Sequence, residues 1–136
     1  MRQLYELARP FPEQLISKKP GGKFQADYVN HAVVTARLLE IVGPYQWEIA
    51  RVITNADGVA VGCIGRLTVT VDGTVSTIEE VGDVERVGDN SASNLKSASS
   101  DAFKRAAMRL GLGLHLWAGD GYFLDRALSK RIDDGN

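Results

Sequence analysis

The sequence predicts an α+β fold in which a three-stranded antiparallel β-meander packs against helices, giving a β-β-β-α core. Two Asp-Gly pairs, Asp57-Gly58 and Asp72-Gly73, separate three stretches rich in alternating or β-branched residues, which is typical of two successive hairpins. Helical periodicity lies on both sides of these stretches. The 136 residues are enough for a single domain that buries its own core. We place the core at about 12–117 and a C-terminal tail at about 118–136.

The elements follow from local patterns. Apolar residues at spacings of three and four predict a helix over residues 28–43, which Gly43 and Pro44 end. Strands are then expected over residues 45–54, 59–71 and 74–82.

A turn-rich crossover at 83–94 leads to a second helix, for which Ser93 or Asn94 is the expected N-cap. This helix has one apolar stripe and one polar face, as expected of a helix packed on a sheet. Gly111 and Gly113 suit its C-terminal end. We expect residues 114–117 to be extended or a turn, and the polar end at 128–136 to fray.

Composition limits the possible functions. The chain carries 16 Lys and Arg against 17 Asp and Glu, so a role in nucleic-acid binding must rest on local charge. The single cysteine, Cys63, excludes a disulfide framework within the chain and is expected to be a buried, reduced thiol. No apolar run approaches the roughly 20 residues of a membrane span, and the first residues are too polar and acidic for a signal peptide. We therefore expect no membrane partner and a cytoplasmic location.

Motifs of catalysis and cofactor binding are missing from the sequence. Lys23 in "PGGK" is followed by Phe24, whereas a phosphate-binding loop has Ser or Thr there. Glu79 and Glu80 are neighbours on a predicted strand, so they point to opposite faces and favour a solvated edge over a paired site. Two histidines and one cysteine give no zinc spacing. We predict no enzyme, no catalytic residue, no metal site and no cofactor.

One signal favours nucleic acid. The polar face of the second helix holds four cations, with only Asp101 to offset them among small Ser and Ala residues: Lys96, Lys104, Arg105 and Arg109. A solvated helix face is the plain alternative, although such faces usually carry acidic partners one turn away. Small residues would let a sugar–phosphate chain approach closely, and cations bind phosphates without reading sequence.

A second basic stretch strengthens this signal. Lys18, Lys19 and Lys23 lie in a glycine-containing loop that could fold over the same groove. Tyr28 follows this loop, where it would either stack a base or simply pack. These four residues complete the candidate DNA-binding set.

Three segments, in this order and spacing, resemble the Rad-fifty-two family of single-strand annealing proteins, including its compact phage and bacterial members. They are "ISKKPGGKFQADYVN" at 16–30, "EEVG" at 79–82 and "KSASSDAFKRAAMRLG" at 96–111. The resemblance covers about residues 12–117, nearly the whole chain. It is strongest in the last segment, where a basic residue precedes an Asp, two residues, Lys-Arg, Ala and a terminal Gly in the family's register.

The resemblance implies a β-β-β-α domain that assembles into a ring. Such rings bind single-stranded DNA along a basic groove and anneal complementary strands without ATP. Lys104 and Arg105 match the basic pair of the groove, Lys96 matches an earlier basic residue, and Lys18 replaces an Arg.

The sequence also departs from the family pattern. Met108 stands where the family often has another Arg, and Arg109 follows one position later, about 100° further round the helix. The crossover before the second helix is also shorter, so a lysine of some relatives has no counterpart. Groove affinity is then either weaker or rebuilt with Lys19 and Lys23.

We therefore predict an ATP-independent single-stranded DNA-binding and strand-annealing protein of homologous recombination and DNA repair. It would act as a ring-shaped homo-oligomer on DNA in the cytoplasm of a bacterium or a phage-infected host cell. Two alternatives stay open: a binder that protects single strands or DNA ends without annealing, and a protein-interaction module whose basic helix docks an acidic partner. A ring would also need an apolar interface, and we expect it to use some of Leu110, Leu112, Leu114, Leu116 and Trp117.

Overall fold

Three long strands form the antiparallel meander that the sequence predicts. The computed structural model describes residues 1–19 and 26–135, and it orders the strands β3 (Gln46–Thr54), β4 (Ala60–Val71) and β5 (Thr74–Asp83). Asp72 and Gly73 both have positive φ angles, 51° and 80°, between the paired residues Val71 and Thr74. Two positive φ angles in a two-residue loop are those of a type I′ hairpin, so the predicted turn is confirmed.

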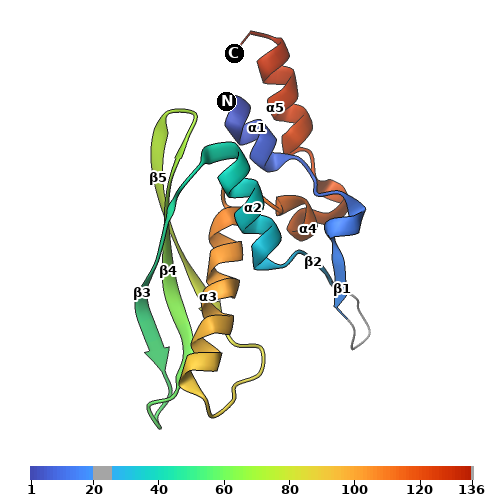
Figure 1. Cartoon of the computed structure of the whole chain (residues 1–136). Helices are drawn as coiled ribbons and strands as arrows, with labels where there is room; N and C mark the ends of the chain where they lie inside the picture. Colours follow the sequence, from blue (N-terminus) through green and yellow to red (C-terminus); the bar gives the residue numbers. More distant parts are fainter. Residues whose placement is uncertain (20–25, 136) are drawn as a thin grey trace.

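Two helices cover one face of this sheet (Figure 1). Helix α2 (His31–Val42) begins at Asn30, whose side chain accepts a hydrogen bond from the Val33 N–H, and it ends at Gly43 with φ 76°. Helix α3 (Ser91–Met108) crosses β4 and β5. Its N-cap is Asn90, whose side chain accepts from the Ser93 N–H.

The predicted N-cap of α3, Ser93 or Asn94, is therefore wrong. Asn94 lies inside the helix with 4 % of its surface exposed. Its amide donates to the carbonyls of Ala60 (2.9 Å) and Gly88 (2.8 Å), and its side-chain oxygen accepts from the Gly88 N–H (3.0 Å). Asn94 thus fixes the crossover and β4 to the helix, because a buried amide must find partners.

Close packing of α3 on the sheet depends on small residues. A Cβ at Gly82 of β5 would lie 2.0 Å from the Ala98 carbonyl oxygen and 2.6 Å from the Ala102 nitrogen, so only glycine allows the helix backbone to lie on the strand. Cys63, Ala98 and Ala102 pack together with no exposed surface. Burial raises the pKa of the Cys63 thiol, with a smaller contribution from Asp101. The prediction of a buried thiol is confirmed.

The main core lies between α2, α3 and the sheet, around Leu38, Leu67 and Phe103. Trp47 of β3 packs edge-on against Phe103 with ring centroids 5.3 Å apart, and its indole N–H donates to the Ser99 hydroxyl of α3 (3.1 Å). This arrangement fixes the position of α3 along the sheet.

The two ends of the chain fold together. α1 (Arg2–Ala8) lies beside α5 (Leu124–Asp133) (Figure 1). Leu128 of α5 is buried, and the Tyr122 hydroxyl donates to the Ala8 carbonyl. The expectation that the tail frays is wrong, since its apolar residues find a partner in α1.

Short elements connect these helices to the rest. A 3₁₀ turn, η1 (Glu13–Leu15), precedes a two-stranded sheet of β1 (Ser17–Lys19) and β2 (Ala26–Tyr28). After α3, residues that we expected to be extended or a turn form α4 (Leu114–Ala118), and η2 (Gly119–Gly121) follows. None of the helices described is both long and apolar enough to cross a membrane.

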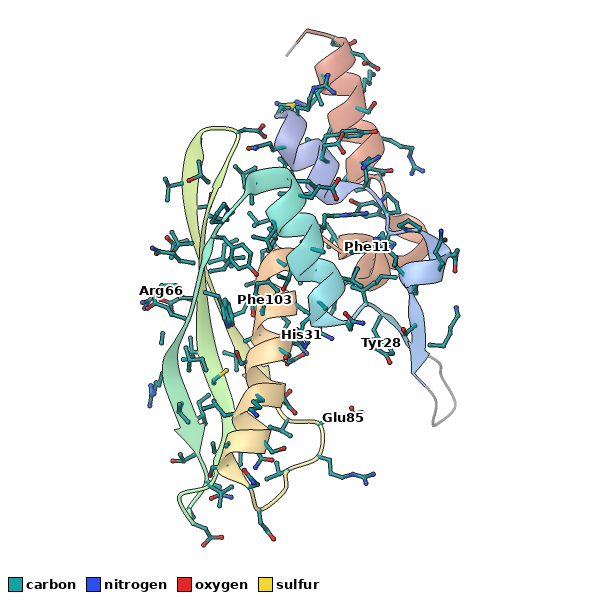
Figure 2. All side chains as sticks on the ribbon, in the orientation of Figure 1. Phe11, Tyr28, His31, Arg66, Glu85 and Phe103 are labelled. Atoms are coloured by element: carbon teal, nitrogen blue, oxygen red, sulfur yellow. The ribbon has the colours of Figure 1, made fainter. Side chains whose placement is uncertain are left out.

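The other face of the sheet is exposed. Figure 2 shows Arg66 of β4 on this outer face, away from the helices, where it forms ion pairs of 3.0 Å with Glu48 and Glu79. Glu80 instead accepts a hydrogen bond from Arg109, the residue directly after α3. The prediction that Glu79 and Glu80 point to opposite faces is confirmed.

Candidate nucleic-acid interface

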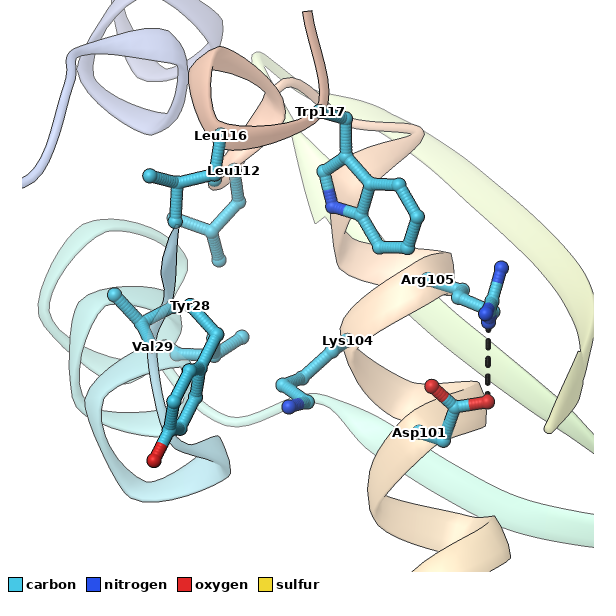
Figure 3. Close-up of a pocket in the computed structure, with 10 residues that line it drawn as sticks. Tyr28, Val29, Asp101, Lys104, Arg105, Leu112, Leu116 and Trp117 are labelled. Atoms are coloured by element: carbon cyan, nitrogen blue, oxygen red, sulfur yellow. Dashed lines mark hydrogen bonds and ion pairs between the residues drawn. The ribbon is translucent and has the colours of Figure 1, made fainter. Parts of the chain in front are cut away.

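A pocket of about 600 Å³ lies where β2, α3 and α4 meet (Figure 3), and we call it the cation–aromatic pocket. Its apolar floor consists of Val29, Val34, Leu112 and Leu116. Charged and aromatic side chains surround this floor: Tyr28, Asp101, Lys104, Arg105 and Trp117. Three of the eight residues proposed from the sequence therefore line one hollow.

Tyr28 and Lys104 come from distant parts of the chain and meet at the pocket. The Lys104 ammonium lies 5.7 Å from the centroid of the Tyr28 ring, within the range of a cation–π contact. Tyr28 is 38 % exposed, so its ring is accessible to a ligand. The sequence left open whether Tyr28 packs or stacks, and the structure places it at the pocket rim beside a cation.

Arg105 is held on two sides. Its guanidinium carbon lies 5.1 Å from the centroid of the Trp117 ring, and its Nε donates to a carboxylate oxygen of Asp101 at 3.1 Å. The same oxygen of Asp101 accepts from the backbone N–H of Asp83 at 3.2 Å. The arginine is thus positioned by its neighbours and is also partly neutralised by one of them.

Trp117 is an aromatic residue of the pocket that we did not propose for DNA. We expected it only as a subunit contact, but it is 53 % exposed at the pocket rim. Leu110 and Leu112, which we expected in the same interface, are buried inside the chain and so cannot supply its surface. The sequence did contain a signal that could have identified Trp117 as a candidate DNA-binding residue. It is a tryptophan that follows shortly after the glycine-rich end of a basic helix.

The other two cations that the sequence placed on the basic helix, Lys96 of α3 and Arg109 directly after it, lie outside this pocket. Arg109 is exposed, and its Nε donates to Glu80 of β5 at 2.8 Å. Lys96 is exposed about two turns before Lys104 in the helix. Neither residue lines the cation–aromatic pocket.

A second hollow, of about 660 Å³, lies between α3 and the crossover before it. It shares Asp101, Lys104 and Arg105 with the first pocket, and three carboxylates and three cations are present among its lining residues. The other lining residues are Asp83, Val84, Glu85, Arg86, Ser97 and Ser100. The two hollows therefore adjoin at these three residues of α3, and we call the two together the recessed flank of α3.

The basic stretch before Tyr28 lies on a neighbouring strand. Ser17 of β1 pairs with Tyr28, and Lys18 pairs with Asp27. Lys18 is exposed, and Lys19 ends the strand. Lys23 lies outside the described residues. The structure thus brings Lys18 near the strand of Tyr28 without placing it in the pocket.

No ligand set for a metal ion stands out in the described residues, where no group of three His, Cys, Asp or Glu side chains is arranged to hold one. The cation–aromatic pocket presents cations and aromatic rings around an apolar floor. Such a combination suits phosphates and flat rings.

Comparison with known proteins agrees with the resemblance of the sequence segments. No curated protein matches the sequence. The family model described as "Rad52/22 family double-strand break repair protein" matches residues 2–125, which is almost the whole chain. The chain therefore belongs to the Rad52/22 family of double-strand break repair proteins.

Proposed function

We propose that the protein binds single-stranded DNA along the recessed flank of α3 and anneals complementary strands without ATP during homologous recombination and DNA repair. The observation that carries the proposal is the meeting of Lys104, Arg105, Tyr28 and Trp117 around one pocket. Cations and aromatic rings in one groove are the usual means of holding single strands without sequence preference. Family membership supports the role in repair.

The mechanism is positioning. Lys104 and Arg105 neutralise phosphates, and the backbone of the strand follows α3 from the cation–aromatic pocket into the second hollow. Contacts between cations and phosphates carry no sequence information, and the described residues of the first pocket include neither Asn nor Gln, the side chains that pair with adenine edges. Most bases therefore keep their Watson–Crick edges free for a second strand.

The proposal includes assembly into a homo-oligomeric ring, which follows the family resemblance. Support in this chain comes from exposed apolar side chains on both outer strands of the sheet, Ile49 and Val52 on β3 and Val81 on β5. Exposed apolar residues on strand edges are typical of surfaces that pair with another chain. Sedimentation at micromolar concentration, with and without single-stranded DNA, tests this part, and a monomer in both conditions would contradict it.

The central test is a fluorescence time course of annealing with two unrelated complementary oligonucleotide pairs, with and without ATP. We expect both pairs to anneal faster with the protein, to the same degree and independently of ATP. Binding without acceleration would favour a protecting role. Absence of binding even at low salt would favour a protein-interaction module instead.

A further inference from the structure

The cation–aromatic pocket has features that phosphate binding alone does not require. Its floor is apolar and deep in the fold, since Val29 is 5 %, Val34 2 % and Leu112 1 % exposed. At its rim stand two aromatic rings, Tyr28 and Trp117, and both are more than one-third exposed. Figure 3 shows them on opposite sides of the pocket with Lys104 between them.

Each of the two cations lies beside one of the rings. Lys104 lies 5.7 Å from the ring of Tyr28, and Arg105 lies 5.1 Å from the ring of Trp117. Positive charge is thus held beside the two rings, and the remaining lining includes the apolar Val29, Val34, Leu112 and Leu116. A ligand that satisfies both parts has a flat apolar body joined to an anion.

A nucleotide unit of a single strand has this chemistry. Its phosphate would meet Lys104 or Arg105, and its base would cover the apolar floor between the two rings. A phosphodiester chain alone would leave the exposed rings of Tyr28 and Trp117 in contact with water. The volume of about 600 Å³ is within the range of pockets that enclose small organic ligands.

We infer that the cation–aromatic pocket receives one nucleobase of the bound strand, turned out of the strand's own base stack. The inference rests on the proposed binding of single-stranded DNA. All four bases present an aromatic face, so the pocket accepts any of them. Each subunit then anchors the strand at one base and leaves the neighbouring bases free to pair.

The test compares two ligands of equal length and charge, a fluorescent oligo(dT) and the same oligonucleotide with abasic sites at every position. Three proteins are titrated with both ligands over a range of salt: the wild type, Trp117→Leu and Phe123→Leu. Leucine keeps the site apolar but removes the ring. Phe123 is the matched control, because it is 64 % exposed and does not line the pocket.

We expect the wild type to bind oligo(dT) about tenfold more tightly than the abasic strand, in line with the usual effect of one base stacked on an aromatic side chain. Trp117→Leu should lose most of this difference while its affinity for the abasic strand and its salt dependence stay unchanged. Phe123→Leu should behave as the wild type. Oligo(dT) should also quench tryptophan fluorescence in the wild type more than in Trp117→Leu, in which Trp47 is the remaining tryptophan.

Three results would overturn the inference. Equal binding of both strands by the wild type excludes a base in the pocket while leaving strand binding intact. An equal loss for both strands in Trp117→Leu, together with a smaller assembly in sedimentation, assigns Trp117 to a subunit contact. No binding of either strand by the wild type refutes the proposed function itself and this inference with it.

Discussion

Asp101 and Arg105 form an ion pair across one turn of α3, with 3.1 Å between the arginine Nε and a carboxylate oxygen. That oxygen also accepts from the Asp83 N–H at the end of β5, so the carboxylate is held on two sides. A fixed negative charge beside Arg105 reduces the attraction that this arginine exerts on a phosphate. The affinity of the groove for phosphate should therefore depend on this carboxylate as well as on the cations.

We expect Asp101→Asn to bind single-stranded DNA several-fold more tightly than the wild type. Asparagine keeps an acceptor for the Asp83 N–H but frees the charge of Arg105, so the slope of log affinity against log salt should steepen by up to about 0.7. Fluorescence anisotropy of oligo(dT) at several salt concentrations measures both quantities. Glu79→Gln is the matched control, since Glu79 pairs with Arg66 on the outer face. An equal gain in both variants would point to net charge alone.

Lys104 and Arg105 should contribute unequally to the binding of single-stranded DNA. We expect Lys104→Ala to lower the salt slope by about 0.7 and Arg105→Ala by less, because Arg105 already has a carboxylate partner. The double variant should bind most weakly and keep its thermal stability, since neither side chain is buried. The same anisotropy titration serves as readout, with Arg66→Ala as the control. If the double variant binds single-stranded DNA with wild-type affinity, neither residue contributes to the groove.

The contact between β5 and α3 should tolerate no added carbon. Gly82→Ala would place a Cβ 2.0 Å from the Ala98 carbonyl oxygen, so helix and strand must separate. We expect a loss of roughly 2 kcal/mol or more in the free energy of unfolding, measured with urea and circular dichroism. Gly121→Ala should cost little, because no atom lies within 4 Å of the Cβ that it adds. Equal stability of the two variants would contradict the packing described.

Tyr122 should make stability depend on pH in alkaline solution. Burial, with a smaller effect of Asp125, raises the pKa of Tyr122 to about 12, although Arg37 acts in the opposite direction. Tyrosine in an unfolded chain titrates near 10. The protonated form therefore favours the fold below pH 10, and this contribution is lost as pH rises towards 12. We expect the stability gap between wild type and Tyr122→Phe to narrow from pH 9 to 11 in urea unfolding. Parallel pH curves would contradict this.

The sheet and the helices beside it could be predicted because their signals are local. Asp-Gly pairs mark the two hairpins, and the three predicted strands agree with the observed ones to within one residue at every end. The start of α3 could not be predicted in the same way. Asn94 is an ordinary N-cap residue by sequence, yet the carbonyls of Ala60 and Gly88 supply partners that only the folded chain brings near.

In the candidate nucleic-acid interface too, contacts within one helix could be predicted from the sequence, whereas contacts between separate elements could not. The pair Asp101–Arg105 is spaced by four residues on one helix and can be predicted from the sequence. The partner of Arg109 is Glu80 on a strand, and the contact of Lys104 is with Tyr28 on another sheet, so both depend on how the elements pack. Trp117 was missed as a ligand contact for this reason, because only the fold places it opposite Tyr28.

The burial of Cys63 has a practical consequence for measuring motion on DNA. It is the single cysteine of the chain, it has no exposed surface, and its thiol is less acidic than usual. A thiol-reactive dye should therefore leave the folded wild type unlabelled, because the thiolate is the reacting species and this one is inaccessible. A cysteine introduced at the exposed Asp57, between β3 and β4 and outside both hollows, would then be the one labelled position. Energy transfer from that dye to a labelled strand would follow single annealing events in real time.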